Sequence, residues 1–253
     1  MSTPWGGLPE FPVQRTLETM DPHSTRPLVS IVLPTLNAGK FLGEGLQSIE
    51  SQSVQEYEVL VIDGGSEDET LLICRDFEKV RVVSQQSKGL TGAWNEGIGQ
   101  AEGEYVALLD SDDIWLPYTL ENHIATLMAH PEKLASIGHM SFFLDNDQQV
   151  PPGFKISLLD QTHLAYMPGC FVGKPTIFET LGLFEMHWKI LSDLVWFDRL
   201  KARPDLFAVC HHEVLRKRVH MGNLSYNTAA QTDTYKKELL QYVRRKMQNS
   251  TPS

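Results

Sequence analysis

The stretch Glu104-Tyr-Val-Ala-Leu-Leu-Asp110-Ser-Asp112-Asp113 predicts both the fold and the position of the chemistry. Its apolar part, residues 105–109, is too short for a buried helix and is typical of a central strand covered on both faces. Three carboxylates follow it directly, at the strand end where ligands bind in open α/β sheets. Because neighbouring carboxylates repel one another unless a cation lies among them, we expect Mg²⁺ or Mn²⁺ there. On these residues alone, a solvated acidic turn is an equally good interpretation.

The whole chain of 253 residues is long enough for one large core, or for a core with a smaller appendage. Its formal net charge of -10 argues against a nucleic-acid partner, because phosphate backbones require a concentrated basic surface. The three cysteines are far apart and lack zinc-site spacing, so we expect reduced core thiols. Since neither a membrane-spanning apolar run nor a secretion signal is found, a soluble cytoplasmic protein is expected.

Strands and helices alternate through the first half of the chain, which is the pattern of a doubly wound, mostly parallel sheet. Ser66 and Glu69 have the capping-box spacing and predict the start of the second helix. We predict strands at residues 28–33, 57–62, 80–84 and 105–109, and helices at residues 41–49, 66–77 and 88–100.

The second half is less regular. Residues 158–166 fit either a short helix or a loop. We predict strands at residues 135–144, 169–172, 207–210 and 214–219, and helices at residues 117–128, 175–181 and 193–202.

The last helix has an apolar stripe of Tyr235, Leu239, Val243 and Met247 among lysines and arginines. Such a helix docks on the protein body, on a partner or on a membrane surface, and the body is the commonest case. The predicted organisation is a loosely ordered arm at 1–27, one domain with a first half at 28–130 and a second half at 131–230, and a helix with its tail at 231–253.

Four segments, in this order, resemble the family-2 glycosyltransferases with the GT-A fold. They are VSIVLPTLN at 29–37, VIDGGSEDET at 61–70, GLTGAWNEGIGQAEGEYVALLDSDD at 89–113 and LSDLVWFDRL at 191–200. The resemblance implies a Rossmann-like, mostly parallel central sheet flanked by helices, with a C-terminal acceptor-side region. It makes 28–130 the nucleotide-sugar-binding half and 131–230 the acceptor-binding half of the same domain. It also implies metal-dependent, inverting transfer of a sugar from a nucleotide-sugar donor to a hydroxyl group.

The resemblance further implies roles for single residues. Asp112 matches the direct metal ligand, His220 a histidine that many relatives place at the metal, and Asp193 the general base for the acceptor hydroxyl. Asp110 matches the acid near the ribose, and Asp63 the acid that approaches the base. The full set expected on the nucleotide-sugar is Pro34, Thr35, Asn37, Asp63, Lys88, Asn95, Asp110 and Ser111.

Two positions depart from the family pattern. Gly64 stands where many members have a second aspartate, so one base-reading carboxylate is missing and a preference for uridine is not secured. Ser192 precedes Asp193 where an acid is common. Neither change removes the expected metal ligand or base.

Each assignment has a simpler alternative. Asp63 would also serve as a cap of the helix predicted at Ser66, and Asp193 as an acid favoured by a helix N-terminus. His220 and Lys88 would also serve as ordinary surface residues. For the whole protein the alternatives are a non-catalytic nucleotide-sugar-binding partner subunit and a nucleotidyltransferase.

The expected partners are a nucleotide-sugar and an acceptor. A UDP-sugar is favoured over a GDP- or dTDP-sugar, and the acceptor is a glycan, a lipid-linked glycan or a small molecule. Peripheral contact with the inner face of a membrane and a homo-oligomer both stay open. Polysaccharide or glycoconjugate biosynthesis is the expected setting.

Overall fold

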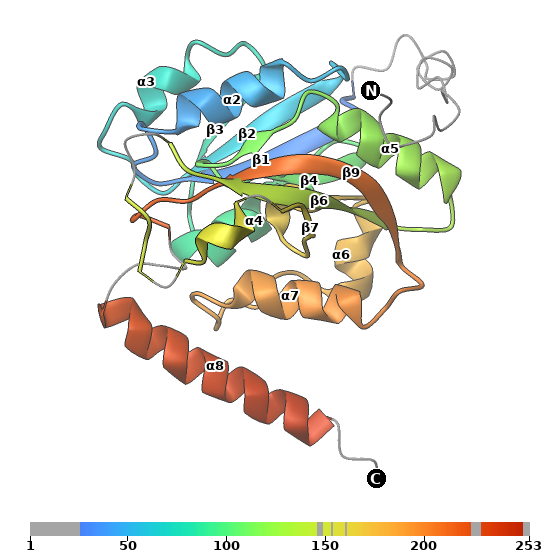
Figure 1. Cartoon of the computed structure of the whole chain (residues 1–253). Helices are drawn as coiled ribbons and strands as arrows, with labels where there is room; N and C mark the ends of the chain where they lie inside the picture. The colour runs from blue at the N-terminus through green and yellow to red at the C-terminus, as the bar shows by residue number, and fades with distance from the viewer. Residues whose placement is uncertain (1–25, 146–148, 153, 160, 224–228, 250–253) are drawn as a thin grey trace, which may run out of the picture.

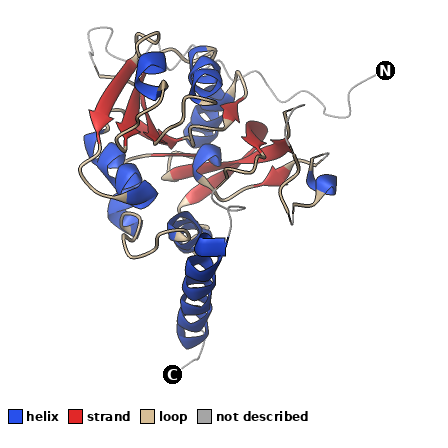
Figure 2. Ribbon diagram, turned by 90° about the vertical axis from the view of Figure 1, so that its left-hand side faces the viewer, coloured by secondary structure: helices blue, strands red, loops and turns tan. Residues whose placement is uncertain are grey.

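The computed structural model describes residues 26–145, 149–152, 154–159, 161–223 and 229–249. Within them, nine strands form one sheet in the order β3-β2-β1-β4-β8-β6-β9-β5, with β7 paired to β6. Helices cover both faces of this sheet (Figures 1 and 2). Nearly all of the predicted N-terminal arm at 1–27 lies outside the described residues.

The first half contains the parallel part of the sheet, as predicted. β1 is buried along its whole length and pairs with β2 on one side and β4 on the other. The register places Thr35 opposite Asp63, so the two strands end side by side. The elements are β1 (Val29–Thr35), α2 (Leu42–Glu50), β2 (Tyr57–Asp63), α3 (Thr70–Cys74), β3 (Val80–Ser84), α4 (Gly89–Gln100) and β4 (Tyr105–Leu108).

The predicted start of the second helix at Ser66 is wrong, since α3 begins only at Thr70. The Ser66 hydroxyl donates to Asp63 at 2.6 Å and accepts from the Asn37 N–H at 2.8 Å, so it does not cap a helix. The side chain therefore joins two loops at the sheet edge instead.

The second half adds antiparallel strands and closes the sheet. β8 lies antiparallel between β4 and β6, whereas β9 runs parallel to β6. The elements are β5 (Ile114–Trp115), α5 (Thr119–Ala129), β6 (Ala135–Phe143), η1 (Ile156–Leu158), β7 (His163–Leu164), η2 (Pro168–Cys170), β8 (Phe171–Gly173), α6 (Thr176–Leu181), α7 (Ser192–Lys201), β9 (Phe207–Arg218) and α8 (Ala229–Asn249).

One long strand, β9, replaces the two strands predicted at 207–210 and 214–219. The pairing of β6 with β9 shifts register on both sides of His139, which is the geometry of a β-bulge. The bulge absorbs the extra residues, so a polar interruption in the sequence does not end the strand. The segment predicted as a short helix or loop at 158–166 instead contains the two-residue strand β7.

Two apolar cores lie on the two faces of the sheet. The first packs α2, α3 and α5 against one face, and the second packs α4, α6 and α7 against the other. Trp94 and Trp196 are completely buried in the second core. All three cysteines are buried and free, as predicted.

The C-terminal helix α8 lies below α7 in Figure 1 and docks on the protein body. Leu239 and Tyr242 pack against a small cluster of Trp188, Leu191 and Val195. Other members of the predicted stripe, Tyr235 and Val243 among them, are exposed. No helix in the described part of the chain is long and apolar enough to cross a membrane.

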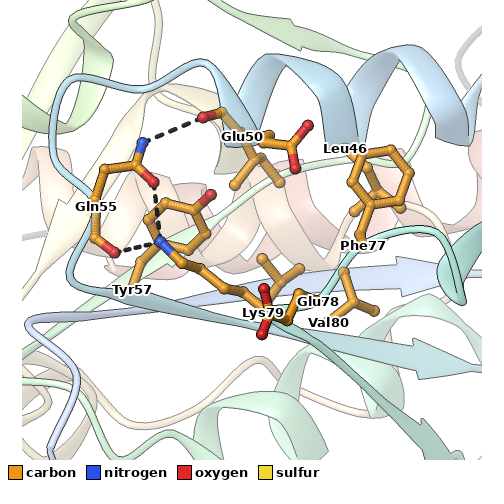
Figure 3. A pocket seen from close by; sticks show the side chains of 10 residues that line it. Leu46, Glu50, Gln55, Tyr57, Phe77, Glu78, Lys79 and Val80 are labelled. Atoms are coloured by element: carbon orange, nitrogen blue, oxygen red, sulfur yellow. Dashed lines mark hydrogen bonds between the residues drawn. The ribbon is translucent and has the colours of Figure 1, made fainter.

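A cavity of about 90 Å³ opens where β2 and β3 begin (Figure 3). Lys79 lies over the Tyr57 ring there and donates to the backbone and side chain of Gln55. Because this cavity lies at the amino ends of the strands, it is separate from the polar edge at their carboxyl ends.

Candidate functional site

The loops after β1 and β2 are joined by hydrogen bonds at the polar edge of the sheet. Asp63 is 6% exposed, and its carboxylate accepts from the backbone N–H groups of Gly65 and Ser66 at 3.0 and 3.1 Å. The Thr35 hydroxyl lies 3.4 Å from the same carboxylate. Asp63 therefore holds the turn that follows it, at the carboxyl end of β2, and does not cap a helix at Ser66, since α3 begins at Thr70.

Asn37 and Pro34 shape the first loop. Asn37 has a positive φ of 50°, and its side-chain carbonyl accepts from the Glu67 N–H at 2.9 Å. Pro34 is buried inside β1 and pairs with Ile62 of β2. Asn37 thus holds the two loops together. Pro34 contributes its place in the pairing of β1 with β2.

The acid cluster lies directly after β4 and contacts the C-terminal end of β9. Asp113 is fully buried and accepts from the Lys217 ammonium at 3.0 Å and from the Arg218 N–H at 3.0 Å. Asp110 lies 3.7 Å from the same ammonium. The three aspartates each bring an oxygen within 4.8 Å of the others. Asp113 is therefore held by protein groups on both of its oxygens, and the side chains of Asp110 and Asp112 are the more exposed members of the cluster.

Lys217 is a site residue that the sequence analysis missed, as it missed Arg218 and Asn223. Burial alone would lower the pKa of its ammonium, but the charges of Asp113, Asp110 and Asp112 raise it well above its usual range. The lysine is therefore a permanent cation among the carboxylates. The available signal was a basic pair, Lys217-Arg218, at the end of a strand that leads to His220.

Arg218 fixes the backbone of the acid cluster. Its side chain is 1% exposed, and its guanidinium lies between the Phe41 and Phe143 rings, 4.7 Å from each centroid. It donates to the carbonyl oxygen of Asp112 at 3.0 Å and pairs with Glu44 and Asp145. Arg218 is thus placed to orient the backbone of Asp112.

His220 and Asn223 hold the Asp112 carboxylate. His220 Nε2 lies 2.9 Å, and Asn223 Nδ2 3.1 Å, from Asp112 Oδ2. The Gly222 N–H donates to His220 Nδ1 at 3.1 Å, so the ring proton lies on Nε2 and is donated to Asp112. Binding a cation through Nε2 would require that proton to move and the Gly222 bond to break.

The carboxylates of the cluster differ in acidity. Burial, together with the neighbouring carboxylates, raises the pKa of Asp110 to about 7 despite the nearby lysine. Burial acts in the same direction on Asp112, but the His220 hydrogen bond and the lysine charge outweigh it and lower its pKa. Asp112 is therefore the carboxylate that stays ionised most readily.

Asp193 joins this cluster from far along the chain. It lies in the first turn of α7 and accepts from the Leu194 N–H at 2.7 Å. Burial raises its pKa, while that hydrogen bond and the charge of Lys217 oppose the shift. Its own charge in turn raises the pKa of Asp110. The two acids that were predicted from separate segments therefore share one electrostatic environment.

Comparison with known proteins identifies the family. The profile of Glycosyl transferase family 2 matches residues 30–191, more than half of the chain. The chain belongs to glycosyl transferase family 2.

Individual relatives agree with this family membership. An uncharacterized glycosyltransferase of Rickettsia typhi is 29% identical over 231 residues, which cover 85% of this chain and 71% of that protein. A UDP-Glc:alpha-D-GlcNAc-diphosphoundecaprenol beta-1,3-glucosyltransferase of Escherichia coli is 35% identical over 104 residues, covering 40% of this chain and 41% of that protein.

Solved structures share the fold. S. aureus TarS 1-349, in complex with UDP-GlcNAc, superposes with a TM-score of 0.64 at 22% identity, covering 79% of this chain and 61% of that chain. This glycosyltransferase thus spans less than two thirds of the solved fragment. The predicted family, enzyme class and GT-A fold are confirmed.

The remaining predicted donor residues of this glycosyltransferase differ in their surroundings. Ser111 lies in the turn between Asp110 and Asp112. Lys88 is exposed directly before α4 and makes no hydrogen bond or ion pair to the described residues. The Asn95 amide donates to the Phe184 carbonyl oxygen at 2.9 Å and accepts from its N–H at 3.0 Å. Asn95 therefore uses both ends of its amide to hold the loop before α7.

The carboxylate oxygens at the acid cluster of this glycosyltransferase fit a hard divalent cation. Asp110, Asp112 and Asp113, together with Asp193, are four carboxylates that share a single ammonium, that of Lys217. When all are ionised, four negative charges and one positive charge leave an excess of three negative charges. Oxygen ligands of this kind suit Mg²⁺ or Mn²⁺.

Proposed function

We propose that this protein is a metal-dependent, inverting glycosyltransferase that moves a sugar from a nucleotide-sugar donor to a hydroxyl acceptor. The observation that carries the proposal is that Asp193, from a distant segment, lies close enough to the acid cluster for its charge to raise the pKa of Asp110 and for the Lys217 charge to act on its own pKa, while Lys217 lies 3.7 Å from Asp110. An acid cluster alone would only bind a cation. A separate, partly buried carboxylate in the same site adds a base.

Asp193 is the proposed general base. Its carboxylate takes the proton of the acceptor hydroxyl while that oxygen attacks the anomeric carbon of the donor. The bond from this carbon to the diphosphate breaks, and its electron pair leaves with the diphosphate. One displacement of this kind inverts the anomeric configuration and requires no covalent intermediate. The raised pKa of Asp193 brings its basicity closer to neutral pH.

Asp112 and Asp110 are the residues proposed to hold the cation. A bound Mg²⁺ or Mn²⁺ would supply electrostatic stabilisation of the diphosphate leaving group. His220 and Asn223 orient the Asp112 carboxylate through their hydrogen bonds to Oδ2. Because His220 Nε2 carries the ring proton, the proposal gives this residue an orienting role in place of the direct ligation predicted from the resemblance.

The donor end of the site is proposed at the loops after β1 and β2. Thr35, Asn37 and Asp63 form the edge next to the acid cluster, and Lys88 and Ser111 extend it. A UDP-sugar is the proposed donor. Two relatives support it, since one is named for UDP-Glc and the solved TarS carries UDP-GlcNAc. The name of the Escherichia coli enzyme likewise supports a lipid-linked acceptor.

A thermal-shift panel tests the proposal. UDP-, GDP- and dTDP-sugars are each added with and without Mn²⁺, since a ligand that binds only the folded state raises its melting temperature. We expect UDP-sugars to give the largest shift, and the shift to require Mn²⁺. If no nucleotide-sugar shifts the protein in either condition, the proposal is wrong.

Turnover separates an enzyme from a binding subunit. UDP release from the donor that gives the largest shift is followed with water as the acceptor and then with glycan and lipid-linked acceptors. Release that depends on Mn²⁺ supports transfer. Metal-dependent binding without any release would instead favour the non-catalytic partner subunit.

A further inference from the structure

The segment between α6 and α7, residues 182–191, has no regular secondary structure and ends directly before Asp193. Its backbone is held on one side by α4. Asn95 makes two hydrogen bonds to Phe184, and the Thr91 hydroxyl donates to the Trp188 carbonyl oxygen at 3.0 Å. Because the loop belongs to no helix or strand, these long-range side-chain hydrogen bonds hold its backbone in place.

On the other side the loop is held by α8 through one carboxylate. Glu238 accepts from the N–H of Lys189 at 2.7 Å and from the N–H groups of Ile190 and Leu191 at 3.0 Å each. Glu238 is only 6% exposed. These three N–H groups come immediately before α7, whose first turn contains Asp193, the proposed general base.

A glutamate is unusual at such a buried position. Burying a charge is strongly unfavourable unless the charge is paired or hydrogen-bonded. No cation of the described residues forms an ion pair with Glu238, so the three N–H donors stabilise its charge. Apolar packing alone would have been satisfied by a leucine. The presence of a glutamate at position 238 is therefore explained by its three hydrogen bonds to the backbone of the loop.

The surrounding contacts make the junction rigid. Leu239 and Tyr242 of α8 pack against Trp188, Leu191 and Val195, which lie on either side of Asp193 in the chain. Further along α8, Arg245 pairs with Glu185 at 2.9 Å, and Lys246 pairs with Asp198 at 2.7 Å. The helix thus contacts the loop before α7 and the middle of α7 itself.

We propose that Glu238 is a positioning residue that fixes residues 189–191 and thereby the location of Asp193. The inference rests on the proposed role of Asp193 as the base. It makes α8 part of the acceptor side of the site, although the helix touches no reacting group. α8 lies outside residues 30–191, which the family profile covers. Misplacing a catalytic group by about 1 Å can slow a reaction on the order of 100-fold, so small shifts of this loop matter.

Hydrogen exchange tests the structural part without requiring any activity. The full chain is compared as wild type, Glu238→Gln and Glu238→Ala, with Gln241→Ala as a matched control at an exposed position of the same helix. We expect the amides of residues 189–194 to exchange about tenfold faster in both Glu238 variants and unchanged in the control. Unchanged protection in Glu238→Ala would overturn the proposal. If the alanine variant fails to fold, Glu238→Gln decides the same question, because it keeps the size of the side chain.

Kinetics tests the functional part. UDP release is measured with UDP-glucose and UDP-GlcNAc in the presence of Mn²⁺, and UDP affinity is measured by calorimetry. We expect Glu238→Gln to lower kcat about tenfold while UDP affinity stays within about twofold, since only the loop of Asp193 is loosened. Equal losses in UDP affinity and kcat would indicate a merely structural role and contradict the proposal. If the wild type releases no UDP, the proposed function fails, while hydrogen exchange still decides whether Glu238 holds the loop.

Discussion

The two halves of this glycosyltransferase build their parts of the site in different ways. In the donor half, Thr35 and Asp63 lie at the ends of paired strands, and Asp63 bonds to residues two and three positions further along the chain. In the acceptor half, the loop before Asp193 is held by partners 97, 89 and 47 positions away, namely Thr91, Asn95 and Glu238. The loops after β1 and β2 are thus fixed mainly by paired strand ends, whereas the loop before Asp193, on the proposed acceptor side, depends on long-range contacts.

This difference between the two halves predicts that substitutions can affect nucleotide-sugar binding and catalysis separately. The acid cluster lies at the carboxyl end of β4. Changes there are therefore expected to alter binding of the proposed metal and nucleotide-sugar. Changes at α7 and its supports are expected to act on the proton transfer. Substitutions in the two halves should therefore give opposite patterns of donor affinity and turnover.

The largest effect is expected for Asp193→Asn. The amide keeps the size of the side chain but cannot accept the hydroxyl proton, so kcat should fall about 1000-fold. Donor affinity, measured by calorimetry with UDP and Mn²⁺, should change little. Normal turnover in this variant would remove Asp193 from the role of base.

The next largest effect is expected for Asp112→Asn, on the donor side. Loss of the carboxylate that His220 and Asn223 orient should weaken Mn²⁺-dependent UDP binding about 100-fold. Asp205→Asn, at an exposed acid that pairs with Arg203, is the control and should bind normally. If both variants bind UDP equally well, Asp112 does not hold the cation.

A smaller effect, on stability, is expected where α4 packs on the sheet. A Cβ added to Gly97 would lie 2.1 Å from Val32 of the buried strand β1, whereas a Cβ on Gly99 meets nothing within 4 Å. Gly97→Ala should therefore lower the free energy of unfolding by about 1–3 kcal/mol. Gly99→Ala, in the same helix, should raise it by about 0.5–1 kcal/mol. Urea titrations that show the same change for both would contradict this packing.

A shift in pH dependence is expected for Lys217→Met, at the junction of the two halves, a variant that also leaves the buried Asp113 carboxylate without its cation and therefore lowers stability. Burial raises the pKa of Asp193, and the Lys217 charge opposes that shift. Without the lysine the pKa should rise further, so less of the base is ionised at a given pH. The acid limb of kcat/KM should consequently move to higher pH.

The control for this pH profile is Lys174→Met, at a lysine that donates to the Pro131 carbonyl oxygen away from the site. Its acid limb should coincide with that of the wild type. A limb that stays in place in Lys217→Met would show that the lysine does not influence the base.

The sequence was sufficient for the parts of the molecule that depend on local patterns. The apolar run before Asp110 and the polar turns after each strand predicted the parallel half of the sheet and the acids at its edge. Asp193 and His220 came only from the resemblance, since neither spacing nor periodicity connects them to Asp112. The structure brings both into the cluster.

The remaining features depend on contacts that no local pattern records. Lys217 lies in a strand whose bulge was not predicted, so the face to which its side chain points could not be assigned. Glu238 has no motif or spacing that singles it out, and its burial follows only from the docking of α8. Asn95 was predicted to meet the donor, but its amide is used by Phe184.

The anomeric configuration of the first product tests the central claim most directly. Sugar released from an α-linked UDP-sugar, with water as the acceptor and Mn²⁺ present, is followed by proton NMR before the free sugar equilibrates. Because one displacement assisted by Asp193 inverts the anomeric carbon, the β-anomer should appear first. Initial release of the α-anomer would contradict the account.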